Sequence, residues 1–548
     1  MKKKLTAWVA LAFAVATEGL ACTNLIVGKA ASADGSVMVT YSADSFGMFG
    51  HLYHSPAGTH TVGETVKIFD WDTAKYLGEI KQVARTYNVI GNINEHQVTI
   101  GETTFGGRPE LVDTTGVIDY GSLIYIALQR STTAREAIQV MTDLVKEYGY
   151  CSEGESFSVA DPNEAWILEM IGKGPGVKGA VWVAVRIPDD CIAAHANQSR
   201  IHQFDLDDKE NCIYSPDVIS FAREKGYFSG LNRDFSFADA YNPLDFSGLR
   251  YCEARVWSFY RRHSAKMEQY LSYILGKTSE PMPLYVKPDK KLTLADVQSD
   301  MRDHYEGTAL DMTKDLGAGP WNSPYRPSPL SFKVDGVEYF NERPIGTQQS
   351  AFTFVSQMRG NLPNAIGGVL WFGMDDANMI AYTPVYCCAT EVPPCYRKDV
   401  ADGVTFSWES AFWVCNWVSN MIYPRYGQMI GDLRQLQQHT EQAYAEAQPR
   451  VEERAMQLYK ADPAQATAYL TDYTVSTAQN MLKGWKLFGE FLIVKYNDLV
   501  VKQVKDGKFL RTAEGLCAPV IRPGFPEEYN RKVMQEVGDR YKVVELQK

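Results

Sequence analysis

Residues 22–36 read Cys22-Thr23-Asn24-Leu25-Ile26-Val27-Gly28-Lys29-Ala30-Ala31-Ser32-Ala33-Asp34-Gly35-Ser36. A short run of β-branched and apolar residues leads to the turn Ala33-Asp34-Gly35, and a second such run continues from Ser36 to Ser42. Two runs of this kind around an Asp-Gly turn predict a β-hairpin. Cys22, the first cysteine of the chain, therefore stands directly before the first strand of the hairpin.

The residues before Cys22 have the pattern of a secretory leader. A basic start, Lys2 to Lys4, is followed by an apolar stretch, Leu5 to Ala16, that is too short to span a bilayer. Small residues occupy the −3 and −1 positions before Cys22. We therefore expect residues 1–21 to be removed and the protein to be exported, either to the periplasm or to the extracellular medium.

Cys22 has two interpretations once the leader is removed. Cleavage by an ordinary signal peptidase leaves a cysteine with a free α-amine, whereas a bacterial lipoprotein signal leaves a cysteine with a lipidated thiol and an acylated amine. The lipoprotein signal usually has Leu at −3, and here Leu20 lies at −2. We expect the free N-terminal cysteine, with a lipid-anchored protein as the alternative.

Composition and charge limit the class of protein and its partners. The chain has 548 residues, of which 45% are hydrophobic, so it can bury a large core. Its formal net charge of −11 disfavours attraction to nucleic acid and to anionic lipid, so we expect neither as a partner. After the leader, no apolar run is long enough to span a membrane. These features are compatible with a monomer or an oligomer.

The order of the predicted elements is typical of a layered α+β protein. Thr133-x-x-Glu136 has the pattern of a capping box and begins a helix that ends at Gly149. From about Trp408 to Asp498 the pattern is mostly helical, with interruptions at Asp462-Pro463 and Asp472-Tyr473. We expect one domain in residues 22–400 and a mostly helical C-terminal elaboration in residues 401–548. Further strands are predicted at residues 156–160, 165–171, 181–187 and 191–196.

A cysteine at a mature N-terminus carries both parts of a nucleophile–base pair. Its α-amine has an unperturbed pKa of about 7.7–8.0, so it can accept the thiol proton at neutral pH without a histidine. Such a residue can attack an acyl carbon, but only after the peptide bond that masks its amine has been cleaved. The alternative is that Cys22 is a small buried residue or one half of a disulfide.

We expect no metal and no other cofactor. Cys387, Cys388 and Cys395 lie close together in the sequence but contain no CxxC pair, so a disulfide or simple packing accounts for them better than a metal site. Three histidines fall within residues 51–60, but no Glu completes a HExxH-type pair with them.

Residues 22–36 resemble the opening of the dipeptidase A and secernin family of N-terminal-nucleophile hydrolases, which is similar to penicillin V acylases and bile salt hydrolases. The likeness extends weakly to Pro384, so it covers about two thirds of the chain. Four other segments match the family in the same order, namely residues 94–103, 133–137, 160–166 and 194–201.

The resemblance implies an αββα sandwich, in which two sheets are stacked between layers of helices and the nucleophile lies at the start of a strand. Cys22 would be the nucleophile and its α-amine the general base. Asp44 lies where the Arg-Asn-x-Asp motif of the family ends, and its carboxylate would orient the α-amine. Tyr41 stands where that motif has Arg, so the contacts of that arginine cannot be carried over to this chain.

Further site residues follow from the same resemblance. Asn197 matches the asparagine whose amide the wider superfamily directs at the developing oxyanion. Arg255 matches a second active-site arginine, chiefly by its distance from Asn197 along the chain. Either Glu102 or Thr103 occupies another polar position of the active site.

Together these features predict an exported cysteine dipeptidase that hydrolyses dipeptides or very short peptides through a thioester acyl-enzyme. A second interpretation retains this mechanism but takes an acyl amide, such as a bile salt conjugate or a penicillin. A third is the lipid-anchored binding protein, in which Cys22 has no catalytic role.

Overall fold

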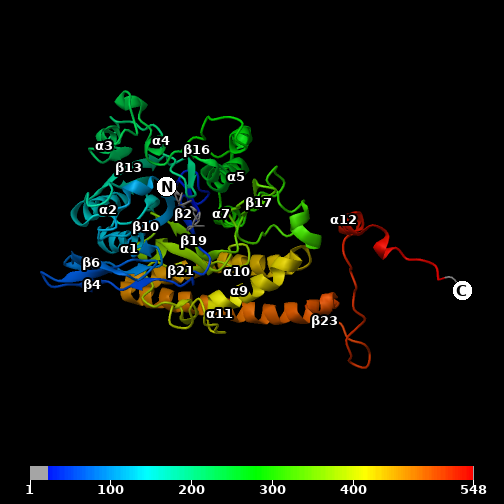
Figure 1. Ribbon diagram of the computed structural model, residues 1–548. Coiled ribbons are helices and arrows are strands. Elements are labelled where there is room, and N and C mark those ends of the chain that lie inside the picture. Colours follow the sequence, from blue (N-terminus) through cyan, green and yellow to red (C-terminus); the bar gives the residue numbers. More distant parts are fainter. Residues whose placement is uncertain (1–21, 547–548) are drawn as a thin grey trace, which may run out of the picture.

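The computed structural model describes residues 22–546. The predicted leader, residues 1–21, lies outside the described residues. Two β-sheets lie face to face with helices on their outer sides, and the C-terminal segment leads away from them (Figure 1). Within residues 22–546, no helix is both long enough and apolar enough to span a lipid bilayer.

The first sheet has seven strands in the order β16-β14-β1-β2-β19-β20-β21, and neighbouring strands are antiparallel. The hairpin predicted in residues 22–42 is confirmed, because β1 and β2 pair with Ile26 opposite Val39. Gly35 lies in the turn with a φ of +78°, which glycine adopts without a Cβ clash. The strands are β1 (Asn24–Val27), β2 (Val37–Asp44), β14 (Ile192–His195), β16 (Tyr285–Val286), β19 (Ser350–Met358), β20 (Val369–Met374) and β21 (Thr383–Tyr386).

The second sheet has eight strands in the order β15-β13-β12-β11-β10-β9-β8-β3, again antiparallel. It contains three of the four further strands that the sequence predicts, while the fourth, at 191–196, is β14 of the first sheet. The strands are β3 (His54–Ser55), β8 (Val89–Ile90), β9 (Ile93–Asn94), β10 (Thr99–Gly106), β11 (Gly154–Ala160), β12 (Ala165–Gly172), β13 (Ala180–Ile187) and β15 (Cys212–Tyr214).

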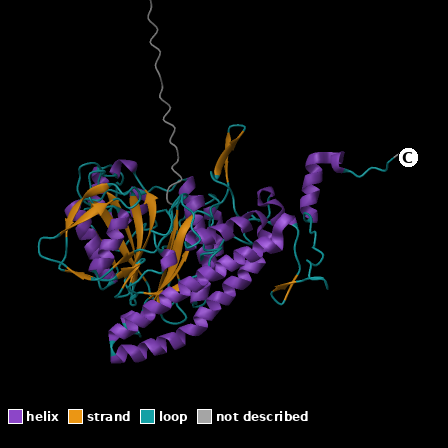
Figure 2. Cartoon of the chain, turned by 90° about the horizontal axis from the view of Figure 1, so that it is seen from below, coloured by secondary structure: helices purple, strands orange, loops and turns teal. Residues whose placement is uncertain are grey.

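Both sheets are covered on both faces, as Figure 2 shows for the two groups of strands between helices. Strand β2 contacts β10 and β11 of the facing sheet, and every residue of β2 and β11 is buried. The α+β class predicted from the sequence is therefore confirmed. Two helices, α1 (Tyr120–Arg130) and α2 (Ala134–Tyr148), pack on the eight-stranded sheet, while α5 (Ala254–His263), α9 (Ala411–Ile422) and α11 (Pro463–Tyr496) pack on the seven-stranded sheet.

The helix predicted between Thr133 and Gly149 is α2. The Thr133 hydroxyl accepts a hydrogen bond from the backbone N–H of Glu136, and Gly149 ends the helix with a φ of +83°. The predicted reciprocal half of the capping box is wrong, because the Glu136 carboxylate accepts from the backbone N–H and hydroxyl of Thr132 instead of the backbone of Thr133. The helix thus has the expected bounds with a different acceptor pairing at its start.

The C-terminal part contains two long antiparallel helices, α10 (Tyr426–Ala461) and α11. The break predicted at Asp462-Pro463 is confirmed, since the Asp462 side chain caps α11 by accepting from the N–H of Ala464. The interruption predicted at Asp472-Tyr473 is wrong. Residues 470, 471 and 474 are buried on one face of α11 while Asp472 faces solvent, so packing holds the helix through weak helix formers.

Helix α1 and the hairpin at residues 331–340 are among the described elements that were not predicted from the sequence. Helix α1 has buried side chains on nearly all sides, so it lacks the apolar–polar period that marks a surface helix. The exposed hairpin of β17 (Ser331–Val334) and β18 (Val337–Phe340) turns at Asp335-Gly336, both with positive φ. That Asp-Gly pair was a signal the sequence offered.

The close approach of the sheets at Gly101 gives a test of the packing. A Cβ added to Gly101 on β10 would lie 2.3 Å from Oδ1 of Asn24 on β1, so Gly101→Ala should destabilise the protein by about 1–3 kcal/mol. A lower thermal unfolding midpoint, measured by circular dichroism, is the expected result. Gly431→Ala in α10 is the matched control, because its Cβ meets nothing within 4 Å and alanine favours a helix. Equal midpoints for the two variants would contradict the packing described here.

Candidate active site

The thiol of Cys22 lies between the two sheets. Its side chain is fully buried, with Sγ 3.7 Å from the Tyr41 hydroxyl and 3.5 Å from Oε1 of Glu102. Tyr41 is on β2 and Glu102 on β10, and the Tyr41 hydroxyl donates a hydrogen bond of 2.5 Å to Glu102 Oε1. Where the family motif has an arginine, this chain thus has the phenol group of Tyr41, which is hydrogen-bonded to a carboxyl group beside the sulfur.

The surroundings of Cys22 keep its thiol protonated. Burial raises the pKa of the Cys22 thiol well above its usual value, and the nearby carboxyl groups of Glu102 and Asp44 raise it further. A thiol is a weak nucleophile, so this sulfur needs a base to remove its proton.

A buried histidine, His195 on β14, does not supply that base. Burial lowers the pKa of His195 to about 3, so its ring is neutral. Its two ring nitrogens are hydrogen-bonded to the hydroxyls of Thr103 and Ser158, each at 2.7 Å. Of the two residues predicted for one polar position, Glu102 therefore lies beside the thiol, whereas Thr103 binds His195.

Asp44 is the last residue of β2 and is buried next to Cys22. Its backbone N–H points toward the Cys22 thiol. Its Oδ2 accepts hydrogen bonds from Arg343 Nη2 at 2.6 Å and the Ser42 hydroxyl at 2.9 Å, and its Oδ1 accepts from the Ser350 hydroxyl at 2.6 Å. A carboxylate offers about four acceptor positions, so these three bonds leave room for one more donor.

Arg255 ties the start of β1 to the loop after β14. It projects from the first turn of α5, and its side chain is fully buried. Burial and the neighbouring Arg343 lower the pKa of Arg255 to about 10, which leaves it cationic at neutral pH. Its guanidinium donates hydrogen bonds to the Cys22 carbonyl oxygen at 2.5 Å, the Thr23 hydroxyl at 2.7 Å, Asn197 Oδ1 at 2.9 Å, the Ala196 carbonyl oxygen at 3.0 Å and the Tyr251 carbonyl oxygen at 2.6 Å.

Asn197 lies in that loop with a φ of +64°, a conformation that asparagine adopts more readily than most residues. Its Nδ2 donates to the carbonyl oxygen of Thr104 at 2.8 Å while its Oδ1 accepts from Arg255, so the amide orientation is fixed. The rest of the loop is held by Glu169 on β12, whose carboxylate accepts from Ser199 and from the backbone N–H groups of residues 200 and 201.

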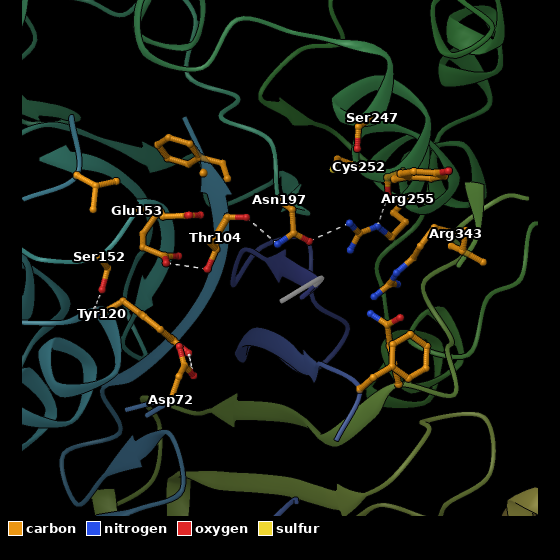
Figure 3. Close-up of a pocket in the computed structure, with 18 of the residues that line it drawn as sticks. Asp72, Thr104, Tyr120, Ser152, Glu153, Asn197, Ser247, Cys252, Arg255 and Arg343 are labelled. Atoms are coloured by element: carbon orange, nitrogen blue, oxygen red, sulfur yellow. Dashed lines mark hydrogen bonds between the residues drawn. The ribbon is translucent and has the colours of Figure 1, made fainter. Parts of the chain in front are cut away.

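A cavity of about 730 Å³ opens beside these residues. Figure 3 shows Asp72, Tyr120 and Glu153 on one side of it and Arg255 and Arg343 on the other. Asn197 and Thr104 lie between the two sides. The cavity therefore has an acidic wall, a basic wall and a fixed side-chain amide at their junction. The acidic residues that line it are Asp70, Asp72, Glu153 and Glu155.

Two residues of the site were missed from the sequence. Arg343 reaches Asp44 from a distant loop, and no local pattern marks it. Glu155 is opposite Thr104 in the β10–β11 register, and its Oε1 accepts from the Thr104 hydroxyl at 2.7 Å. A charged residue directly before the apolar strand at 156–160 was the available signal for Glu155. The site brings together Cys22, Tyr41, Asp44, Glu102, Asn197 and Arg255.

The other cysteines form neither disulfides nor a metal site within residues 22–546. All ten cysteines, which fall within residues 22–546, are free thiols, and Cys387, Cys388 and Cys395 are buried in the core. In the same described range, no group of three His, Cys, Asp or Glu side chains is arranged to hold a metal ion.

This geometry, with a buried thiol before a sheet strand and an asparagine and arginine over a cavity, is accompanied by clear sequence relationships. The profile of peptidase family C69 matches residues 21–57 and 53–439, so the chain belongs to this family. This confirms the family resemblance of residues 22–36 and establishes the class of protein as a peptidase.

Curated relatives carry consistent names. A probable dipeptidase of Salmonella dublin is 29% identical over 398 residues, which cover 69% of this chain and 84% of that protein. A probable dipeptidase of Latilactobacillus sakei is 26% identical over 74% of this chain and 82% of its own length. Dipeptidase A of Lactobacillus helveticus is 24% identical over 72% and 80%, respectively.

The buried ion pair of the site predicts a strong effect on stability. Arg343→Met leaves the Asp44 carboxylate buried without its cation, so it should destabilise the protein by about 3–5 kcal/mol. Adding Asp44→Asn should restore part of that loss in thermal unfolding. Arg531→Met, which removes an exposed ion pair with Glu527, is the control and should change stability by no more than about 1 kcal/mol. If the stability losses of Arg343→Met and Asp44→Asn simply add in the double variant, the two side chains do not stabilise each other.

Proposed function

We propose that the protein is an exported cysteine dipeptidase of the N-terminal-nucleophile type. Its nucleophile is the Cys22 thiol and its general base is the α-amine that Cys22 gains when residues 1–21 are removed. One observation carries this proposal. Arg255 donates hydrogen bonds both to the carbonyl oxygen of Cys22 and to the side chain of Asn197, and Arg255 and Asn197 line the cavity.

The layer order supports the N-terminal-nucleophile fold. Two antiparallel sheets face each other between helices, and the residue before β1 is Cys22. This agrees with an αββα sandwich whose nucleophile stands at a strand start. The remaining acceptor position of Asp44 suits the Cys22 ammonium group, which would be held next to its own thiol.

The hydrolysis proceeds in two stages, formation of a thioester and its hydrolysis. In the first, the α-amine takes the Sγ proton as sulfur bonds to the carbonyl carbon of the substrate, and the oxyanion forms within reach of the Asn197 amide. The C–N bond then breaks, the leaving amine takes the proton, and a thioester remains. In the second, water gives a proton to the α-amine while its oxygen attacks the thioester carbon, and the C–S bond breaks as sulfur regains its proton.

The cavity suits a substrate that carries both charges. A dipeptide has an ammonium group at one end and a carboxylate at the other, and the cavity has an acidic wall opposite a basic wall. The relatives' names as dipeptidases agree with this substrate class. An acyl amide such as a bile salt conjugate has no ammonium group for the acidic wall.

The processed N-terminus provides a first test. Intact-mass analysis of the protein purified from its natural secretory route should give a chain that begins at Cys22 with no added mass, because small residues at −3 and −1 fit the ordinary signal peptidase. A diacylglyceryl adduct on Cys22 would instead support the lipid-anchored interpretation and remove the general base.

Replacement of the nucleophile provides a second test. Cys22→Ala should abolish hydrolysis of a dipeptide while the thermal unfolding midpoint stays near that of the wild type, since one sulfur atom is lost at the terminus. Cys252→Ala is the matched control, because Cys252 is also a buried thiol and lines the same cavity. It should retain most of the activity. Wild-type turnover by the Cys22→Ala variant would exclude Cys22 as nucleophile.

A further inference from the structure

The acidic wall of the cavity ends in a pair of buried carboxyl groups, one on the wall and one behind it, that the proposed chemistry leaves without a role. Glu102 and Glu155 are 0% and 1% exposed and lie on the neighbouring strands β10 and β11. Oε1 of Glu102 accepts from Tyr41, and Oε1 of Glu155 accepts from Thr104. The Oε2 atoms of both are buried, and within residues 22–546 neither has a hydrogen-bond partner other than the facing carboxyl group, with which it can bond only while one of the two carries a proton.

No cation compensates this pair in the described part of the chain. None of the ion pairs found in residues 22–546 includes Glu102 or Glu155. Burial raises the pKa of both carboxyl groups, and the charge of Glu102 raises that of Glu155 further. When two carboxyl groups are in contact, the charge of one opposes ionisation of the other, so one of them keeps its proton unless a positive charge binds beside the pair. The pair therefore favours a cationic ligand.

The position of the pair agrees with the geometry of an aminoacyl group. In a peptide the α-nitrogen is two bonds from the carbonyl carbon, about 2.5 Å away. With that carbon about 3–3.5 Å from the attacking sulfur, the substrate ammonium lies within about 6 Å of Sγ. Glu102 Oε1 is 3.5 Å from Sγ, and Glu155 extends the carboxyl pair to the cavity wall.

The other acidic side chains near the cavity fit this role less well. Asp44 already binds Arg343, Ser42 and Ser350. Asp72 accepts a hydrogen bond from the Tyr120 hydroxyl, and Glu153 is exposed to solvent. Among the described acidic residues that line or border the cavity, Glu102 and Glu155 combine burial with an Oε2 atom that no N–H group binds, and Glu102 lies 3.5 Å from the sulfur.

We infer that Glu102 and Glu155 form the subsite for the free α-ammonium group of the substrate. This inference rests on the proposed function, because it places the scissile carbonyl at the Cys22 sulfur. Charge-assisted hydrogen bonds from the ammonium to the two Oε2 atoms satisfy the buried oxygens and orient the adjacent carbonyl group. The enzyme thereby selects substrates by their unblocked N-terminus, and Tyr41 serves as a positioning residue for Glu102.

The test compares a dipeptide with its N-acetyl derivative. Glu155→Gln is nearly isosteric, keeps an acceptor for the Thr104 hydroxyl and removes the charge. It should lower kcat/KM for the free dipeptide by about 10- to 100-fold and leave kcat/KM for the acetylated dipeptide within about twofold. Glu147→Gln is the matched control, with the same chemical change at an exposed position of α2 that does not line the cavity, and should preserve the wild-type preference for the free amine.

A binding measurement keeps the test valid if Glu155→Gln does not fold. In the inactive Cys22→Ala background, Glu102→Gln should weaken binding of the free dipeptide by about 10-fold or more in calorimetry, with the acetylated dipeptide unaffected. Equal loss for both dipeptides, or an unchanged preference in both variants, would overturn the subsite. If Cys22→Ala remains active, the proposed nucleophile fails instead, so the two failures are distinguishable.

Discussion

The guanidinium group of Arg255 holds together the segments that form the site. It joins the backbone of Cys22, the loop that carries Asn197 and the first turn of α5 through hydrogen bonds of 2.5–3.0 Å. A buried cation is costly unless its donors are satisfied, and these acceptors satisfy them. Because the same group holds the backbone of Cys22 and the amide of Asn197, a shift in any one segment would change the distance between the sulfur and the oxyanion position that we propose.

The electrostatics around Cys22 give a physical reason for the proposal that activity depends on processing. The thiol lies beside two carboxyl groups in a buried site, and both effects oppose its ionisation. While Cys22 remains joined to Ala21, its nitrogen is an amide and cannot take a proton. Cleavage creates a base within the same residue, next to Asp44. Under the proposed mechanism, the site is therefore inert in the precursor and complete in the processed chain, without a histidine.

Much of the fold followed from local sequence patterns, because those patterns act over a few residues. The Asp34-Gly35 turn specified the first hairpin, and Thr133 and Gly149 specified the bounds of α2. Helix α1 was missed because it is buried on nearly all sides and lacks a clear polar face, and the break expected at Asp472 was overridden by packing in α11.

For the site, too, some residues could be identified from the sequence and others only from the tertiary structure. The family resemblance brought Cys22, Asp44, Asn197 and Arg255 into view, and the structure brings them together. Arg343 and Glu155 were not foreseen, since a loop some 300 positions further along the chain than Asp44 supplies the one and strand register places the other. Glu102 and Thr103 were equivalent in sequence, and only the alternation of side chains along β10 separates them.

The most direct measurement is activity as a function of cleavage before Cys22. A chain in which a specific protease site replaces the residues just before Cys22 can be purified uncut and then cleaved to leave Cys22 first. The account predicts no dipeptide hydrolysis before cleavage, and a rate that rises in proportion to the fraction of chains that begin with Cys22. Hydrolysis by the uncut chain at the rate of the cleaved one would contradict it.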